Sequence, residues 1–347
     1  MLPASRLDAA RCALHYAGTT SALHQRSRNR SQRPRNGARP GVGSRQQAAF
    51  SGKRAASPLE SISYSCAKSR ERPLKFSGRA TLAICALSLG CASIRPGDPG
   101  PEIRVLVYNI HAGKDAKGVD NLARVAELVR STRADIALLQ EVDRGTTRSG
   151  QVDQPAVLSS LTGFNVAFGK TLDYQGGDYG IAVLSRWPIR HDSLISLPVV
   201  PPQQRAGGSH EPRGALSAII QVPDGEVEVL NTHIDASRED FYRRQEMTTL
   251  LQLAARSTGQ LRRSMLLGGD LNAEPGSAVI EMIRGSPLRD PWPECGQGSG
   301  LSYPYDRPVK RIDYLLLPAG WRCVSARVLE TDASDHRPVF FVLTRVR

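Results

Sequence analysis

Cysteine is scarce in residues 101–347, the part of the chain that carries most of its long apolar runs. Residues 101–347 contain only Cys295 and Cys323, and no Cys-X-X-Cys pair occurs in the sequence. Their separation matches no zinc motif, and the histidines show no His-X-X-His spacing, which argues against a zinc site built on His111 and His233. The two cysteines are expected either to form a disulfide, in an oxidising compartment, or to be two buried free thiols.

Residues 101–347 also lack a net charge, because 29 Lys and Arg balance 29 Asp and Glu. The formal charge of +13 comes from residues 1–100, which carry 17 Lys and Arg against 4 Asp and Glu. Strong non-specific binding to nucleic acid depends on Lys and Arg that neutralise phosphates. The equal numbers of basic and acidic residues therefore disfavour an extended DNA-binding surface on residues 101–347. A local basic stripe is the remaining alternative.

Residues 1–73 lack any sustained apolar period and are rich in Arg, Ser, Gly and Pro. Such a composition buries too little apolar surface to offset the entropy of ordering, so it predicts disorder. A basic arm that binds nucleic acid is the alternative. A third interpretation is an over-extended start, because Met1 is followed by no methionine before Met247.

The apolar run 80–89 is too short to span a bilayer as a helix. Preceded by the basic segment 74–79, it is typical of a secretory signal, which predicts a signal peptide over 74–93 and a bacterial start at Leu74. Gly90-Cys91-Ala92-Ser93 resembles a lipoprotein cleavage site; a plain signal is the alternative. We expect an exported protein, periplasmic or anchored to the membrane through Cys91, or a cytoplasmic one if the signal is not used.

Residues 94–101 are interpreted as a linker and 102–347 as one folded domain without internal repeats. The domain alternates short apolar runs with polar turns. Strands are predicted at 103–108, 134–139, 181–185, 216–222, 227–232, 264–268, 312–317, 323–329 and 339–343. Helices are predicted from an Asp120 cap to 133, near 155–161, and from Ser237 to 256. About nine strands with few helices predict an α+β fold, in which two mixed β-sheets pack face to face with helices outside.

Polar residues stand at one edge of several of these predicted strands. They are Asn109, His111, Glu141, Asn231, His233, Asp270, Asn272, Asp313, Asp335 and His336. Each alone would be read as a turn, cap or structural residue, but open α/β folds place their chemistry at such edges. Asp-X-Asn and Asp-His pairs can polarise a water, hold a phosphoryl oxygen and bind a hard cation. The set predicts phosphate ester hydrolysis.

Seven short motifs follow one another along the domain. They are Tyr-Asn-Ile-His at 108–111, Gln-Glu at 140–141, Tyr-Gly-Ile-Ala-Val-Leu-Ser-Arg at 179–186, Asn-Thr-His at 231–233, Gly-Asp-Leu-Asn-Ala-Glu-Pro at 269–275, Arg-Ile-Asp-Tyr at 311–314 and Ser-Asp-His-Arg-Pro at 334–338. In this ordered set the sequence resembles the endonuclease/exonuclease/phosphatase superfamily, which has the deoxyribonuclease I-like fold. The resemblance covers nearly all of 103–343 and implies a four-layer α/β/β/α sandwich.

The resemblance implies a site for Mg²⁺ or Mn²⁺. Glu141 would be the main ligand, with Asn109 nearby and Asp335 as a further carboxylate. A hard cation that keeps several waters suits one or two protein oxygens. The resemblance also places His111 and Tyr179 among the substrate-binding residues.

The remaining roles that the resemblance implies concern the water and the phosphate. Asp270 would orient or deprotonate the attacking water, and Asn272 would donate to a phosphate oxygen. His336 would hydrogen-bond the scissile phosphate, with Asp313 fixing its tautomer or charge. His233 would contact the phosphate and assist the leaving group. The transition state needs charge dispersal and in-line geometry more than covalent help.

Three further polar residues are harder to assign. Arg213 is expected either to contact the substrate phosphate or to form a surface ion pair. Arg243 and Gln245 fall on the long predicted helix and are interpreted as structural or solvent-facing.

The sequence thus predicts an Mg²⁺- or Mn²⁺-dependent hydrolase that attacks a phosphate ester in line with a water. The expected partner is a phospholipid headgroup, an inositol phosphate or a nucleic acid, and the chain is expected to be a monomer. One alternative is a secreted DNA or RNA endonuclease, which the lack of a basic-aromatic insertion disfavours. An inactive binding module is the other, and it should have lost Glu141, Asp270 or His336.

Overall fold

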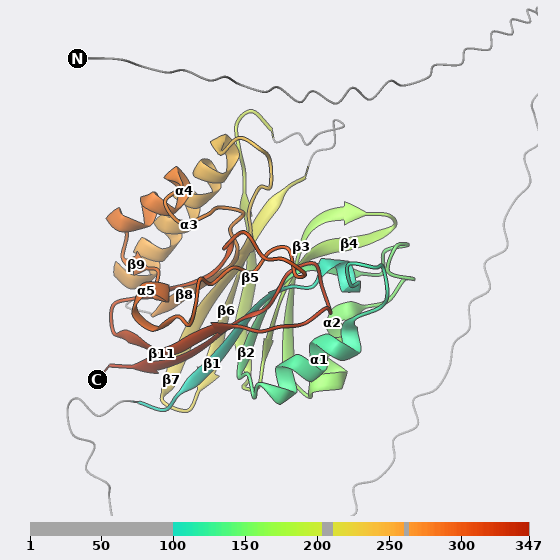
Figure 1. Cartoon of the computed structure of the whole chain (residues 1–347), viewed down its shortest axis with the longest axis horizontal. Helices are drawn as coiled ribbons and strands as arrows, with labels where there is room; N and C mark the ends of the chain where they lie inside the picture. Colours follow the sequence, from blue (N-terminus) through green and yellow to red (C-terminus); the bar gives the residue numbers. More distant parts are fainter. Residues whose placement is uncertain (1–99, 203–210, 260–263, 347) are drawn as a thin grey trace, which may run out of the picture. The chain divides into compact units, whose positions relative to one another are not determined.

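Twelve strands of the described residues form two six-stranded sheets (Figure 1). This computed structural model describes residues 100–202, 211–259 and 264–346. The first sheet has the order β11 (Trp321–Val328), β12 (Val339–Arg345), β1 (Ile103–Asn109), β2 (Ile136–Arg144), β4 (Gly177–Ser185) and β3 (Asn165–Tyr174). The second has the order β5 (Ile189–Leu197), β6 (Arg213–Val222), β7 (Gly225–His233), β8 (Met265–Asp270), β10 (Asp313–Pro318) and β9 (Leu288–Arg289). The predictions for 1–73, for the signal 74–93 with Cys91, and for most of the linker 94–101 lie outside the described residues.

Each sheet contains one parallel pair of strands among antiparallel neighbours. The parallel pairs are β1 with β2 and β7 with β8. Because parallel strands need a crossover connection, α1 (Leu122–Ser131) joins the first pair and α3 (Phe241–Gly259) joins the second. The carboxyl ends of each pair therefore finish at the same edge of their sheet, which is where the polar motifs fall.

Three apolar cores separate four layers. One core lies between the sheets and includes Val107, Leu138 and Leu266. A second packs α1 and α2 (Gln154–Thr162) on the first sheet, and a third packs α3 and α4 (Ala278–Glu281) on the second. Figure 1 shows α1 and α2 on one side of the sheets and α3 and α4 on the other. The predicted fold class, a four-layer α/β/β/α sandwich of two mixed sheets, is confirmed.

The predicted number of strands was too low. The strands β3 and β5 at the sheet edges, and the two-residue β9, were not anticipated. Most residues of β3 and β5 are exposed or half-buried. Edge strands with polar side chains limit unwanted pairing and therefore lack the apolar run that marks a buried strand.

Two predicted helix starts were wrong. The residue before α1 is Asn121, not Asp120, and its side chain does not cap the helix. Its amide instead donates to the carbonyls of Ile110 and Ala333, at 2.8 and 2.6 Å. Ser237 does not begin the long helix either, since its N–H and hydroxyl both donate to Asp235 in a turn. Local side-chain bonds of this kind compete with capping.

Several short elements complete the described fold: the turns of 3₁₀-helix η1 (His111–Gly113) and η2 (Met282–Gly285), and α5 (Trp292–Cys295). Cys295 and Cys323 form a disulfide that joins α5 to β11. Of the two expectations for this pair, the structure has the disulfide. No helix among the described residues has the length and hydrophobicity needed to cross a membrane.

Candidate active site

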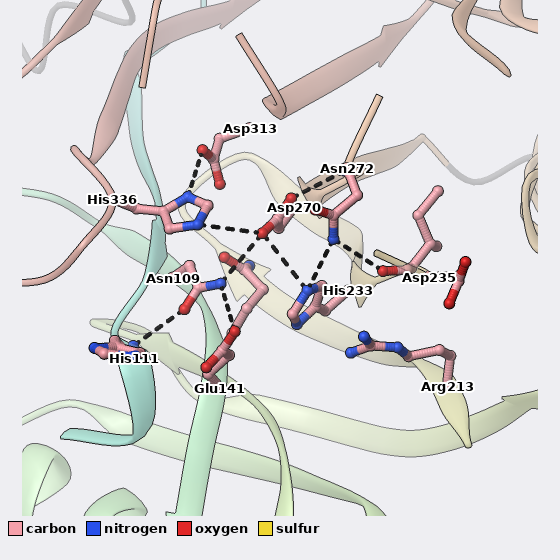
Figure 2. Close-up of polar contacts among 12 residues, drawn as sticks. Asn109, His111, Glu141, Arg213, His233, Asp235, Asp270, Asn272, Asp313 and His336 are labelled. Atoms are coloured by element: carbon pink, nitrogen blue, oxygen red, sulfur yellow. Dashed lines mark hydrogen bonds and ion pairs between the residues drawn. The ribbon is translucent and has the colours of Figure 1, made fainter. Parts of the chain in front are cut away.

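Polar side chains from both sheets meet where the parallel strand pairs end (Figure 2). Asn109 is the last residue of β1, and Glu141 lies in the adjacent strand β2. His233 and Asp270 end β7 and β8 and are partners in register. Asp313, the first residue of β10, is the partner of Asp270 on the other side. The two sheets thus contribute to one site.

The loop before β12 supplies two further predicted residues, Asp335 and His336. This loop is tied to the end of β1 by Ser334, whose hydroxyl donates to the carbonyl of Asn109 at 2.8 Å. The backbone N–H of His336 donates to the same hydroxyl oxygen at 3.3 Å. The last predicted residue, Asn272, lies two positions after β8.

A bulge in β2 directs Glu141 out of the sheet. The register between β2 and β4 shifts between Leu139 and Val142, and Glu141 has a positive φ of 56°. Asn272 and His111 also have positive φ, 43° and 52°. Such backbone conformations cost a residue other than glycine about 1 kcal/mol or more and gather at functional sites. The strained positions here coincide with predicted site residues.

Beneath the site, a pair of buried amides links the two sheets. Gln140 of β2 donates to the side-chain oxygen of Asn231 of β7 at 2.7 Å. The amide of Asn231 donates in turn to the carbonyls of Leu139 and Ala182, both at 2.9 Å. Both side chains are fully buried. Sequence analysis noted Asn231 without assigning it a role; the structure shows that it fixes the bulge next to Glu141.

His336 and Asp313 form a buried pair. His336 Nδ1 lies 3.0 Å from an oxygen of Asp313, which also accepts from the Ser302 hydroxyl at 2.6 Å. Burial opposes the charged imidazole, but the carboxylates of Asp313 and Asp270 outweigh it and raise the pKa of His336 to about 10. His336 is therefore an imidazolium at neutral pH, and its contact with Asp313 holds its charge and orientation; the role of the pair in binding phosphate stays a prediction.

Asp270 lies at the centre of the site. One oxygen accepts from the Asn109 amide at 3.2 Å and lies 3.6 Å from Nε2 of both His233 and His336. The other accepts from the backbone N–H of Asn272 at 3.0 Å. Burial, followed by the charge of Asp313, raises the pKa of Asp270 to about 7. A carboxylate with a pKa near neutrality is suited to accept a proton from water.

His233 contacts two residues of the strand end beside it. Its Nε2 lies 3.1 Å from the amide nitrogen of Asn272 and 3.6 Å from Asp270. The Asn272 amide also donates to the carbonyl of Ile234 at 3.1 Å, which fixes the orientation of this side chain. We call Asp270, Asp313, His233 and His336, which are at most 5% exposed, the buried cluster.

Glu141, Asp335 and His111 form a second group, which we call the open edge. The side chains of Asp335 and His111 are 29% and 41% exposed, and His111 Nδ1 lies 4.0 Å from Asp335. Asn109 connects the two groups, because its amide donates to Glu141 as well as to Asp270, each at 3.2 Å. Its oxygen accepts from the N–H of His111 at 3.1 Å. The role of Asn109 as a metal ligand stays a prediction.

The donor chemistry of the site fits a divalent cation. Carboxylates of both groups lie around the single imidazolium of His336, and such an excess of negative oxygen suits Mg²⁺ or Mn²⁺. Among the described residues, Asp270, Asp313 and His336 present ligand atoms within 4.8 Å of one another. His336 Nδ1, however, is already hydrogen-bonded to Asp313. The carboxylates of the open edge face solvent, so they are the more accessible ligands for a cation.

A cavity of about 570 Å³ opens over the buried cluster. The predicted residues that line it are Glu141, His233, Asp270, Asn272, Asp335 and His336. Tyr303 also lines it, with its ring centroid 4.7 Å from that of His336. Ser302, Tyr303 and Ser334 support the site from loops whose sequence gives no periodic signal, and only Ser334 lay within a recognised motif.

Of the three predicted substrate-binding residues, His111 lies at the open edge, whereas Tyr179 and Arg213 are not among the residues that line the cavity. Tyr179 is buried beneath Arg148, whose guanidinium stacks on its ring at 5.2 Å. Arg213 forms an ion pair with Glu211 at 3.3 Å; this pair is buried, whereas the expected one was at the surface, and a contact of Arg213 with the substrate phosphate stays a prediction. Arg243, interpreted from sequence as structural or solvent-facing, is buried and lines the cavity.

Comparison with known proteins agrees with this fold. Residues 106–336 match the model of the endonuclease/exonuclease/phosphatase family, and the chain belongs to this family. A family protein from Beutenbergia cavernae is similar at 25% identity and a TM-score of 0.58, over 70% of this chain and 72% of that one. A mannosyl-6-phosphatase from Bacteroides thetaiotaomicron matches at 17% identity and 0.59, over 70% and 99%. The human nocturnin catalytic domain, with bound sulfate, matches at 20% and 0.54, over 71% and 94%.

Proposed function

We propose that this chain hydrolyses phosphate esters with the help of a divalent cation, Mg²⁺ or Mn²⁺. One observation carries the proposal: a buried carboxylate, Asp270, lies between two imidazoles and opens into a cavity that Glu141 and Asp335 also line. Acid–base groups and cation ligands are the parts that in-line attack by water requires. All the residues that an inactive module should have lost are present.

Each side chain has a task that follows from its contacts. Asp270 takes the proton of the attacking water, since its pKa lies close to the working pH. The imidazolium of His336, held by Asp313, donates to a phosphoryl oxygen and balances the charge that develops there. Asn272 holds His233 at the cavity wall, where its ring contacts the phosphate on the leaving-group side.

Glu141 and Asp335 would hold the cation at the open edge. When bound, the cation neutralises phosphate charge and lowers the barrier for departure of the alcohol. Asn109 links Glu141 to Asp270 through its amide and thereby sets the position of the base relative to the metal ligand.

The proposal is tested with the purified full chain. Release of phosphate or of the alcohol is measured from p-nitrophenyl phosphate, inositol phosphates, sphingomyelin or a lysophospholipid, and plasmid DNA. We expect hydrolysis with Mg²⁺ or Mn²⁺ that stops in excess chelator and returns when the metal is restored. Full activity in excess chelator would contradict the cation mechanism, and a preference for DNA would favour the nuclease alternative.

We also propose that the protein is exported. The Cys295–Cys323 disulfide supports this, because disulfides persist mainly in oxidising compartments, and it agrees with the signal expected over 74–93. A reporter fused after this segment should leave the cytoplasm, and Cys91→Ala should release any membrane-bound fraction. A reporter that stays in the cytoplasm would refute export.

A further inference from the structure

A covalent cross-link lies close in sequence to the buried cluster. The disulfide ties the end of α5 to β11, and Ser302 follows Cys295 after a short stretch of chain. Ser302 is fully buried, and its hydroxyl donates to the oxygen of Asp313 that also lies 3.0 Å from His336 Nδ1. We call residues 296–303 the connecting segment. It runs from the disulfide to the hydrogen-bonded pair on which the proposed hydrolysis depends.

The first half of the connecting segment is hydrogen-bonded to the two elements that the disulfide joins. The N–H of Gln297 donates to the carbonyl of Ala326 in β11 at 2.8 Å. The indole N–H of Trp292 in α5 donates to the carbonyl of Gly298 at 3.2 Å. Gly300 has a positive φ of 75° and lies so close to the Trp292 ring that a Cβ would come within 2.7 Å of it. The path of the segment therefore depends on how α5 is held against β11.

The position of α5 depends on contacts outside the helix itself. It is a single turn of four residues, too short to be stable alone. Its Trp292 packs edge-on against Phe341 in the core between the sheets, with ring centroids 6.3 Å apart. The disulfide is its covalent attachment and spans a sequence separation of 28, within which both Ser302 and Asp313 lie. Opening this loop gives more conformational freedom to the chain that carries both partners of the 2.6 Å hydrogen bond.

A small dithiol can reach the disulfide from solvent, because Cys295 is partly exposed and the adjacent Glu294 is exposed. One thiolate of the dithiol attacks Sγ of Cys295 and displaces Cys323 as a thiolate, and the second thiolate of the reductant then displaces Cys295. The S–S bond of the protein breaks, two electrons and two protons pass from the dithiol to the two cysteines, and the dithiol becomes a disulfide. The reverse exchange with an oxidised dithiol restores the bond.

We propose that the Cys295–Cys323 disulfide is a redox-sensitive switch of the hydrolase. In the oxidised chain, α5 and the connecting segment hold Ser302 on Asp313, and the pair with His336 is correctly placed. In the reduced chain the sheets stay packed through their three apolar cores, but Ser302 is released and turnover falls. The inference rests on the proposed phosphate ester hydrolysis and confines that activity to oxidising surroundings.

The test compares the oxidised and reduced forms of the full chain at saturating Mg²⁺, on the most rapidly cleaved of the esters named above. Four cysteines outside the described residues are first replaced by Ser, so that the disulfide alone responds to the reductant: Cys12, Cys66, Cys85 and Cys91. Thiol titration confirms each redox state, and circular dichroism with thermal unfolding checks that both forms are folded at the assay temperature.

We expect reduction with dithiothreitol to lower kcat by about 10-fold or more, and reoxidation to restore it. The size follows from the sensitivity of turnover to position, since a displacement of about 1 Å can cost about 10²-fold. The combined variant Cys295→Ser and Cys323→Ser should turn over like the reduced chain and should not respond to dithiothreitol.

Two further variants locate the effect. In Ser302→Ala the ratio of oxidised to reduced kcat should fall towards one, because the hydrogen bond that the disulfide secures is already absent. Glu141→Gln is the matched control. It lowers activity through the proposed metal ligand, which lies outside the loop that the disulfide closes, and it should keep the ratio of the parent chain.

If the variant without Cys295 and Cys323 fails to fold, the reversible reduction of the disulfide decides. An unchanged kcat in the folded reduced chain, or unfolding of the chain on reduction, would overturn the switch while the hydrolase proposal stands. An unchanged redox ratio in Ser302→Ala would overturn it as well, since the effect would not pass through this hydroxyl. Hydrolysis of no ester by either form would overturn both proposals.

Discussion

The buried cluster and the open edge face the same cavity but are built differently. Asp270 and Asp313 of the cluster are almost completely buried and have hydrogen-bond partners on neighbouring strands and loops. Glu141 and Asp335 at the open edge are partly exposed; Glu141 accepts from the Asn109 amide and Asp335 from the Ser334 hydroxyl. Burial raises the pKa of Asp270, and against the opposing effect of burial the carboxylates of Asp313 and Asp270 raise the pKa of His336. Exposure at the open edge leaves room for exchange of water and ions.

From this difference we assign proton transfer to the buried cluster and cation binding to the open edge. Proton transfer requires fixed groups with a tuned pKa, and only a desolvated cluster supplies them. A hard cation keeps part of its water shell, so its ligands must remain open to solvent. Substitutions in the cluster should therefore act on turnover, and substitutions at the open edge should act on the metal requirement.

The largest effect is expected for Asp270→Asn. The amide keeps the shape of the side chain but cannot accept the proton, so kcat should fall by roughly 10²- to 10⁴-fold. KM should change little, because the amide occupies the same space. Steady-state kinetics measure both values, and thermal unfolding checks that the variant folds. A loss confined to KM would show that Asp270 binds substrate and is not the base.

His336 and Asp313 should behave as one unit. His336→Ala and Asp313→Ala should each cost about 10²-fold or more in kcat/KM, because the imidazolium needs its carboxylate partner. The double variant should lose much less than the product of the two losses. The kcat/KM values of the wild type, the two single variants and the double variant are measured on one substrate at saturating Mg²⁺. Multiplicative losses would mean that the 3.0 Å contact has no part in turnover.

Glu141→Gln should mainly change the response to metal. Loss of the carboxylate charge weakens cation binding, so activity at low Mg²⁺ should fall by about 10²-fold and recover in part as Mg²⁺ is raised. A Mg²⁺ titration of the rate checks this. Glu127→Gln, on the exposed face of α1, should titrate like the wild type. An unchanged Mg²⁺ requirement in Glu141→Gln would place the cation away from the open edge.

Asn231→Ala should give the smallest effect on rate and a clear effect on stability. It leaves the buried carbonyls of Leu139 and Ala182 without their donor, at a cost of about 1 to 3 kcal/mol in the free energy of unfolding. Asn165→Ala is a control, since its amide also donates to two carbonyls, but at a partly exposed sheet edge. Denaturant unfolding of both variants measures the difference. Equal stabilities would mean that the bridge between the sheets contributes nothing.

Much of the fold could be predicted from sequence because buried strands leave a strong apolar signal. The runs around Leu138, Leu266 and Phe341 fall in the core between the sheets, and the motifs at their ends meet in the site. The edge strands and helix starts could not be predicted, because polar residues there follow local hydrogen bonds rather than a period.

The supporting residues of the site escaped prediction for a related reason. Ser302 and Arg243 act on partners at 11 and 8 positions away, Asp313 and Asp235, and Asn231 acts on Gln140 of the other sheet, 91 positions away. No local pattern records such contacts. Ser302 and Arg243 lie outside the recognised motifs, whereas Gln140 and Asn231 lie within two of them, and the motifs do not show that these two side chains contact each other.

The amide bridge between Gln140 and Asn231 joins the two sheets, and the packing of these sheets affects which core substitutions the protein tolerates. Since Glu141 stands on one sheet and Asp270 on the other, the distance between the proposed metal ligand and the proposed base is set by the thickness of the sandwich. Packed sheets lie about 10 Å apart, and this spacing depends on the volumes of the side chains between them. Enlarging a core residue such as Leu138 or Leu266 would thus alter the spacing of the two groups without contacting either. Selection for turnover would then act on the volume of the core as well as on the residues that line the cavity.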